Sequence, residues 1–315
     1  MSVLPETLKK PEIVALGDGQ VFIKRTSSGQ VKSVKGFITL REQLGQLAEI
    51  SNKIMITASG YNELNKIASI SVITPEKLVL PSGETVVNPY PIIDPLSKTI
   101  EKVWVKKMAV GFGPIGNLVI TTSTLLYDIT MYFIQDLAKK IQTNKNAGKI
   151  CMKSTLTSEE LQKGVFHAIQ GELGVWADYN NPEVLKALDT FIQNKLFAER
   201  KAQTICERLV MKKHPALSTV NVLSEGPLKA RISKVEVIGF CHDFTREDLL
   251  EIAQKAADEG AGGEMEVKGH RVQTIDVSGE VTDDEISAGA EGDEGSGGGE
   301  DNSSSEIPSG QLGLY

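Results

Sequence analysis

Two short stretches of the chain combine positive charge with regular spacing. In the first, Lys102, Trp104 and Lys106 alternate with other residues, and Lys107 follows. Alternate residues share one side of a β-strand, so an aromatic ring would lie between two cations. Lysines attract phosphate groups, and an exposed indole can stack on an unpaired base. The alternative is that Trp104 faces the core, which would leave Lys107 and Glu101 at the surface.

The second stretch repeats polar and basic residues every four positions in a strongly helical segment. Arg200, Thr204, Arg208 and Lys212 recur at this interval, with Lys201 alongside. Residues four apart lie on one helical face, so we expect a basic ridge about three turns long. Such a ridge can follow a phosphate backbone. The alternative is an ordinary solvated face whose cations are balanced by interspersed glutamates.

Other motifs that carry chemistry lack their usual context. Residues 111–116 have the letters of a dinucleotide-binding fingerprint, but a strand-like segment follows where a helix is needed, which favours a hairpin turn. The four histidines never lie at zinc-ligand spacing from cysteines. Cys206 falls on an apolar helical face, which indicates a buried, inert thiol. We therefore expect no enzyme activity, no cofactor and no metal site.

The charge of the chain is unevenly distributed. Eleven of its 41 acidic residues lie in 276–315, a segment without Lys or Arg, which leaves 30 acidic against 34 basic residues elsewhere. A mildly basic body with an acidic tail is a pattern found in nucleic-acid-binding proteins. The three widely spaced cysteines suit a reducing compartment, and no membrane-spanning or leader segment is recognisable, so we expect a cytoplasmic protein.

The elements that must position these residues predict an α+β fold, with a mostly antiparallel sheet packed with helices. The expected strands and hairpins cover residues 20–34, 53–58, 67–73, 77–80, 85–87, 100–112, 118–122, 234–240 and 272–277. The expected helices cover residues 40–50, 124–142, 157–173, 182–188, 189–213 and 245–260. We expect one domain over 12–275. The segment 276–315, rich in Gly, Ser and acid, predicts a disordered tail.

The segment Glu199-Arg-Lys-Ala-Gln-Thr-Ile-Cys-Glu-Arg208 follows a β-rich half and resembles the helix with a Lys-Ala-x-Thr core of phage-type single-strand annealing proteins. The resemblance implies a sheet with helices, assembly into rings or filaments, and binding of single-stranded DNA in a basic groove without ATP. Lys102, Lys106, Lys107, Arg200, Lys201, Arg208 and Lys212 would contact phosphates, and Trp104 would stack on a base.

The tail contains Glu306-Ile-Pro308 and ends Gln311-Leu-Gly-Leu-Tyr315, so apolar residues follow a run of acid. It is similar to the tail of bacterial single-stranded DNA-binding proteins, which implies a replication or repair protein as its partner. A plain solubilising segment is the alternative. We therefore expect sequence-independent binding and annealing of single-stranded DNA in phage-type recombination or replication by a homo-oligomer. The rival hypothesis is a non-enzymatic phage structural or assembly protein whose basic ridge is a protein interface.

Overall fold

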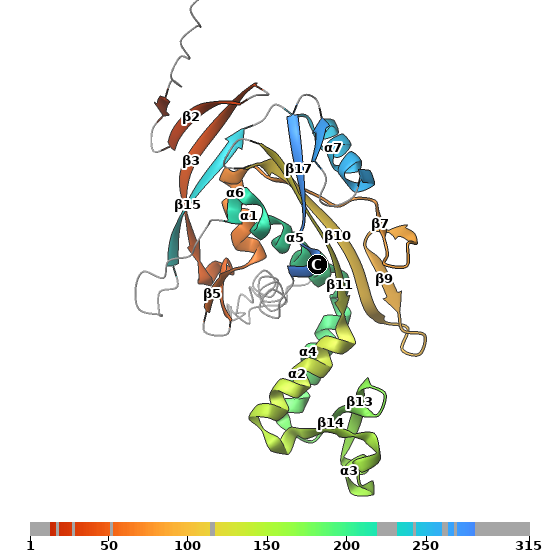
Figure 1. Ribbon diagram of the computed structural model, residues 1–315. Helices are drawn as coiled ribbons and strands as arrows, with labels where there is room; N and C mark the ends of the chain where they lie inside the picture. The colour runs from red at the N-terminus through yellow and green to blue at the C-terminus, as the bar shows by residue number, and fades with distance from the viewer. Residues whose placement is uncertain are drawn as a thin grey trace, which may run out of the picture.

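Two β-sheets enclose a layer of helices in the body of the protein, and a smaller lobe projects from one end (Figure 1). The computed structural model describes residues 13–16, 19–26, 29–50, 53–113, 117–218, 232–241, 244–259, 264–267 and 270–280. Its sheets are mostly antiparallel and are packed with helices, which confirms the predicted α+β class.

The first sheet has four antiparallel strands. Their order is β1 (Ile13–Leu16), β2 (Gly19–Thr26), β3 (Gly29–Arg41) and β15 (Ile232–Cys241). Residues 37–41 of β3 alternate between the two faces of the sheet, so Leu40 is fully buried while Phe37 and Arg41 are exposed. One face of β3 over residues 34–41 therefore belongs to the core, and the other faces outward.

The second sheet has six strands and is built on a long hairpin. Strands β10 (Ile100–Phe112) and β11 (Leu118–Asp128) pair antiparallel along their length. The remaining strands are β6 (Ser71–Ile73) and β9 (Tyr90–Ile93), which both pair with β10, and β17 (His270–Asp276) and β16 (Glu264–Val267) on the side of β11. Only the β11–β17 pairing is parallel among the described pairs.

Helices α1 (Ala58–Ala68), α5 (Ala198–Lys213) and α6 (Pro215–Ser218) lie between the two sheets. The main core joins Leu64 of α1 and Leu209 of α5 to Val235 of the first sheet and Ala109 of the second. Helix α7 (Arg246–Glu259) packs Ile252 and Ala253 on the far face of the second sheet, against Met108 and Val110. It covers only the end of β10 that contains these residues.

The projecting lobe follows β11 and returns to the body at α5 (Figure 1, lower part). Its elements are α2 (Ile129–Thr143), η2 (Lys145–Ala147), β12 (Gly148–Met152), η3 (Lys153–Thr155), α3 (Ser158–Lys163), β13 (Gly164–Gln170), β14 (Leu173–Asp178) and α4 (Pro182–Leu196). A separate core that includes Leu137, Val175 and Val184 joins α2 and α4 to the three-stranded sheet.

The remaining elements are short. They are η1 (Glu42–Leu44), β4 (Leu47–Ile50), β5 (Lys53–Ile56), β7 (Lys77–Val79), β8 (Thr85–Val87) and η4 (Ser278–Glu280).

The predicted β10 strand, the hairpin that follows it and helix α7 are confirmed. The predicted start of the helix at 157 is also confirmed, since Thr157 and Glu160 form a capping box across the first turn of α3. Pro182 occupies the first turn of α4, where its missing amide hydrogen costs nothing.

Several predicted boundaries are wrong, and tertiary pairing explains most of them. The helix expected over 124–142 begins only at Ile129, because residues 124–128 pair with β10 and extend β11 beyond its expected end at 122. The expected helix 40–50 is instead the end of β3, a short 3-10 turn and β4. The strand expected over 67–73 is confirmed only at Ser71–Ile73 as β6, because α1 continues to Ala68. The helix expected to run to 173 ends at Lys163, because residues 164–170 pair with β14 as β13. The helix expected over 189–213 breaks at Phe197, where the chain leaves the lobe and enters the layer between the sheets.

The folded body continues past residue 275. Strand β17 ends at Asp276, Val277 is buried in the main core, and the amide of Thr124 donates a hydrogen bond to Ser278 Oγ at 2.8 Å. The rest of the predicted tail, residues 281–315, lies outside the described residues. None of the helices in the described ranges has the length and apolar character needed to cross a membrane.

Candidate nucleic-acid interface

Strand β10 has two faces with different surroundings. Val103 and Val105 are fully buried against Ala202 and Ile205 of helix α5. Lys102, Trp104 and Lys106 point to the opposite face and are all partly exposed. The predicted arrangement of an aromatic ring between two cations is therefore present at this end of the sheet. The alternative, with Trp104 in the core and Lys107 at the surface, is wrong.

Cross-strand pairing builds a broader patch around Trp104. Tyr90 on β9 and Leu126 on β11 are its register partners, so the three side chains form one row across the sheet, and all are partly exposed. Lys102 lies in the row below, and Lys106 in the row above opposite Thr124. We call Tyr90, Lys102, Trp104, Lys106 and Leu126 the Trp104 face.

The two lysines of the Trp104 face differ in their electrostatic surroundings. Lys102 Nζ forms an ion pair with Asp128 Oδ2 at 2.9 Å and lies 3.9 Å from Glu101 Oε1. The hydrogen bond from Lys102 to Asp128 raises the pKa of the lysine. Asp128 also caps helix α2 by accepting a hydrogen bond from the Met131 amide at 3.0 Å. No ion pair of Lys106 is formed with the described residues, so Lys106 is the freer cation of the two.

Lys107 does not lie on this face, which corrects its predicted role as a phosphate contact. It follows Lys106 and so points to the α5 side, where it is 7% exposed. Its Nζ forms an ion pair with Glu207 Oε2 of α5 at 3.4 Å. Lys107 therefore links strand to helix rather than facing solvent.

The prediction that Arg208 is an exposed member of a basic ridge on α5 is wrong. Its side chain is 1% exposed, and its Nε donates a hydrogen bond to the Ile56 carbonyl at 2.8 Å. The guanidinium carbon lies 5.9 Å from the centre of the Tyr61 ring. Burial lowers the pKa of Arg208 to about 10, which still leaves it charged at neutral pH, and raises the pKa of Tyr61 to about 12. Arg208 joins α5 to β5 and α1 inside the helix layer.

The other predicted cations of α5 are scattered. Lys201 is 4% exposed and donates a hydrogen bond to Asn194 Oδ1 at 3.1 Å, so it is not a surface contact either. Lys212 is partly exposed near the end of the helix, and Arg200 is exposed near its beginning. The reason is that α5 packs on the second sheet and is also covered by α4 at Lys201 and by β5 and α1 at Arg208, so a four-residue repeat cannot keep all its members in solvent. A continuous ridge does not form.

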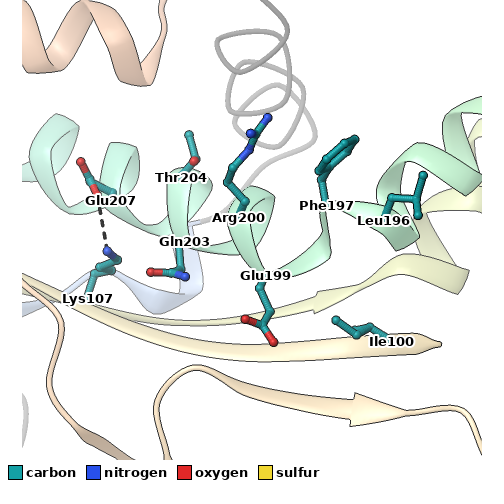
Figure 2. Close-up of a pocket in the computed structure, with 9 residues that line it drawn as sticks. All are labelled: Ile100, Lys107, Leu196, Phe197, Glu199, Arg200, Gln203, Thr204 and Glu207. Carbon is teal, nitrogen blue, oxygen red and sulfur yellow. Dashed lines mark hydrogen bonds and ion pairs between the residues drawn. The ribbon is translucent and has the colours of Figure 1, made fainter. Parts of the chain in front are cut away.

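An open groove of about 540 Å³ lies beside the beginning of α5. Figure 2 shows Arg200 and Thr204 on one side of the helix, and Glu199 and Gln203 on the side of β10. Arg200 lies over the Phe197 ring, 5.0 Å from its centre. The groove is lined by Ile100, Lys107, Leu196, Phe197, Glu199, Arg200, Gln203, Thr204 and Glu207. Its two carboxylates balance its two cations, so it is a poorer site for a polyanion than the Trp104 face.

Two aromatic residues at exposed positions of sheets were missed by sequence reasoning. Tyr90 directly follows the turn residues Asn88 and Pro89, which masked its place in a strand. Phe37 is 53% exposed on β3, between Lys35 and Thr39 on the same side of the strand. The signal for Phe37 was available, because residues 35–41 alternate polar or aromatic residues with glycine and aliphatic ones.

The structure also locates the weaker motifs. Gly111 and Phe112 end β10, and Phe112 pairs with Leu118 at the start of the antiparallel strand β11, so the hairpin interpretation is confirmed; residues 114–116 lie outside the described residues. Cys206 is fully buried, and burial raises the pKa of its thiol to about 12, as expected for an inert cysteine. Within the described ranges, no three His, Cys, Asp or Glu side chains gather as metal ligands would.

Comparison with protein-family models, curated proteins and solved structures finds no match to this chain.

Proposed function

We propose that the protein binds single-stranded DNA without sequence preference, and that it promotes the annealing of complementary strands in phage-type recombination or replication. The observation that carries the proposal is the Trp104 face, where two partly exposed aromatic side chains lie between Lys102 and Lys106 on an uncovered end of the second sheet. The unpaired bases would stack on Trp104 and Tyr90, and the lysines would contact phosphates.

The chemistry of this face favours single strands over duplex DNA. Every unpaired base has a π-face available for stacking, whereas the bases of a duplex already stack on one another. Stacking of one base on an aromatic side chain contributes about 1–3 kcal/mol by alanine substitution. Neither step requires a nucleotide cofactor, so annealing would depend on strand binding alone.

The direct test is fluorescence anisotropy of a labelled single strand of about 30 nucleotides, with unlabelled duplex as competitor. We expect binding that prefers the single strand and weakens with salt, by about 0.7 in log affinity per log unit of salt for each phosphate contacted. Binding would justify mixing complementary strands to look for faster pairing. Failure to bind at low salt would contradict the proposal.

A matched pair of lysine variants sharpens the test. Lys106→Glu places a negative charge on the Trp104 face, whereas Lys163→Glu makes the same change at an exposed site in the lobe. We expect the first variant to weaken binding strongly and the second to bind nearly as the wild type does. Equal effects of the two variants would mean that only net charge matters, and would remove the Trp104 face as the site.

The second candidate function is assembly, and one observation favours it. Of the twenty large apolar side chains exposed among the described residues, eleven lie in 129–197, which is the projecting lobe and its junction with α5. A concentration of exposed apolar side chains in one part of a protein favours a protein interface there. This candidate places the protein interface on the lobe and not on the predicted basic ridge of α5, because Lys201 and Arg208 of that ridge are buried.

The two candidates are compatible if the lobe associates with a second copy of the chain. One short sheet face contacts few nucleotides, and a homo-oligomer would extend the binding surface. Sedimentation velocity over a range of protein concentrations, with and without the oligonucleotide, tests this part of the proposal. A monomer under all these conditions would exclude self-association. A cytoplasmic location and a replication or repair partner for the tail remain parts of this proposal.

A further inference from the structure

The outer face of the four-stranded sheet carries a second arrangement of aromatic ring and cations. On β3, Phe37, Thr39 and Arg41 are exposed, and on β15 the same is true of Ile232, Lys234, Glu236 and Ile238. The inner face of the same two strands holds Leu40, Val235 and Val237 in the main core. Alternation along paired strands thus separates a buried apolar face from an exposed one.

Phe37 lies near the centre of this exposed face and is 53% exposed. Lys234 Nζ lies over its ring, 4.7 Å from the ring centre. Lys35 precedes Phe37 on the same side of β3 and forms an ion pair with Glu236 at 2.8 Å. Arg41 lies four residues beyond Phe37, about 13 Å along the strand. Three cations and one carboxylate therefore surround one exposed aromatic ring.

We propose that this face, formed by Lys35, Phe37, Arg41 and Lys234, is a second binding surface for single-stranded nucleic acid. An unpaired base would displace the Lys234 ammonium from the Phe37 ring and stack there, and the displaced lysine and Arg41 would contact phosphates on either side of the base. The inference rests on the proposed function, because it assigns the same class of ligand to a different sheet. It adds that a strand contacts the protein at two separate sets of residues.

The charge balance and shape of the face select this ligand. The excess of cations over carboxylates favours a polyanion, and a flat sheet with a central ring suits an extended strand whose bases are free to stack. Sheets that bind RNA single strands use exposed aromatic residues on central strands in the same manner. A duplex, with its bases already stacked, would engage only the cations.

The test compares single substitutions in the full-length protein, with labelled oligothymidine of about 30 nucleotides as the probe. Phe37→Leu keeps an apolar side chain but removes the ring, and should lower affinity by about 5- to 150-fold, since one stacked base contributes about 1–3 kcal/mol. Phe37→Trp should restore or improve binding. Val79→Ala, at a 60% exposed apolar site on β7, is the control and should leave affinity unchanged.

The cations are tested through the salt dependence. Arg41→Gln and Lys234→Gln should each reduce the slope of log affinity against log salt by about 0.7, if each contacts one phosphate. Glu236→Gln removes the only described carboxylate of the exposed face and should tighten binding. Circular dichroism should show wild-type thermal midpoints for these surface variants, so that any change in affinity comes from the face itself.

The outcomes separate this inference from the proposed function. If Trp104→Leu weakens binding while Phe37→Leu does not, the second surface is excluded and the proposed function stands. If the wild type does not bind the probe, both fail. If both single variants weaken binding and the losses multiply in the double variant, two independent surfaces are supported. If the double variant binds as tightly as the single variant with the lower affinity, the two substitutions act on one surface, and a second surface is excluded.

Discussion

Helix α5 and strand β10 both carry lysine or arginine at regular intervals, yet only the strand presents them together. On β10, Lys102, Trp104 and Lys106 share the face that points away from α5. On α5, Arg208 is buried near the middle of the predicted ridge while Arg200 is exposed near its beginning. The difference follows from the surroundings of each element. At this end β10 has a helix on one side only, whereas α5 packs on the second sheet and is covered on other sides by α1, β5 and α4.

A strand period predicts which residues share a face more reliably than a helix period does, although exposure along that face still changes, from partly exposed Trp104 to Met108, which is buried under α7. A two-residue repeat returns to the same face of the sheet, whatever its length. A four-residue repeat drifts around a helix of 3.6 residues per turn, so a long row reaches several environments. The ridge on α5 therefore passes from the groove of Figure 2 at Arg200 into the core at Arg208.

The largest effect should come from Arg208, which tests whether α5 is a buried helix or a surface ridge. Arg208→Ala removes the partner of the Ile56 carbonyl and leaves a cavity beside Tyr61, so we expect a loss of about 3–5 kcal/mol in the free energy of unfolding. Arg200→Ala on the same helix should cost at most about 1 kcal/mol, the worth of its contact with Phe197. Urea denaturation measures both. Equal and small losses of stability in the two variants would support the solvent-exposed ridge instead of a buried Arg208.

The stability of the fold should also depend on pH through His214, which follows α5 and, like Arg208, is an ionisable side chain buried in the body. Its Nδ1 accepts a hydrogen bond from the Ala216 amide, so Nε2 donates to the Val119 carbonyl. Burial lowers the pKa of His214 to about 4, below the unfolded value near 6.5. Neutral His214 therefore makes its full contribution to the free energy of unfolding above pH 6.5. This contribution is lost as the pH falls towards 4, and the total loss is about 3 kcal/mol.

Urea denaturation at several pH values, compared between the wild type and His214→Gln, isolates this effect. The variant should lose the part of the pH dependence that lies between 6.5 and 4. His167→Gln is the comparison: burial also lowers the pKa of His167, but this side chain is only partly buried, so the variant should remove a smaller part of the pH dependence. An unchanged pH profile in His214→Gln would contradict the assignment.

Trp104 tests the strand side of the comparison. Trp104→Leu should lower the affinity for a single strand by about 5- to 150-fold, the worth of one stacked base. Phe197→Leu, at a 41% exposed site in the groove beside α5, should change affinity little. Anisotropy titrations at one salt concentration measure both. The reverse result would place the nucleic acid at α5 instead of β10.

Asp128 provides a smaller change in the opposite direction. Asp128→Asn weakens the ion pair with Lys102 but keeps a side chain that caps helices well, so α2 should remain intact. The freed lysine should tighten strand binding by a few fold and steepen its salt dependence by about 0.7. If affinity falls instead, Lys102 does not contact phosphate.

The smallest effect should come from the acidic segment. Truncation after Glu280 keeps η4 and the hydrogen bond between Thr124 and Ser278, while it removes nine acidic residues. We expect strand affinity to stay the same or to rise modestly, since a competing polyanion is lost. A matched chain in which these acids are changed to Asn or Gln separates charge from length. A large loss of affinity would contradict this role.

Several elements could be predicted because local signals agreed with the tertiary structure. The boundaries of β10 are the clearest case, since thirteen residues of β-forming sequence end at a glycine-rich turn. The cap at Thr157 was equally predictable, yet the helix it begins ends at Lys163, because pairing with β14 outweighs the weak helical pattern of 164–170. Local preference decides the start of an element more often than its end.

The candidate site was predicted only in part. The sequence placed Lys102, Trp104 and Lys106 on one face, but it could not bring Tyr90 beside Trp104, because their pairing depends on a connection through β9. It also could not show that Lys107 would find Glu207, a residue a hundred positions away. Contacts between distant segments have no local signal.

By itself, the sequence determined the fold class, the alternation of β10, the acidic character of 276–315 and the absence of familiar catalytic motifs. These follow from local periodicity and composition, which each segment carries regardless of its neighbours. The tertiary structure alone decided which cations reach solvent. Helix α5 packs on the second sheet, and α4 covers Lys201 while β5 and α1 cover Arg208. On β10, α7 covers only one end and leaves Trp104 partly exposed.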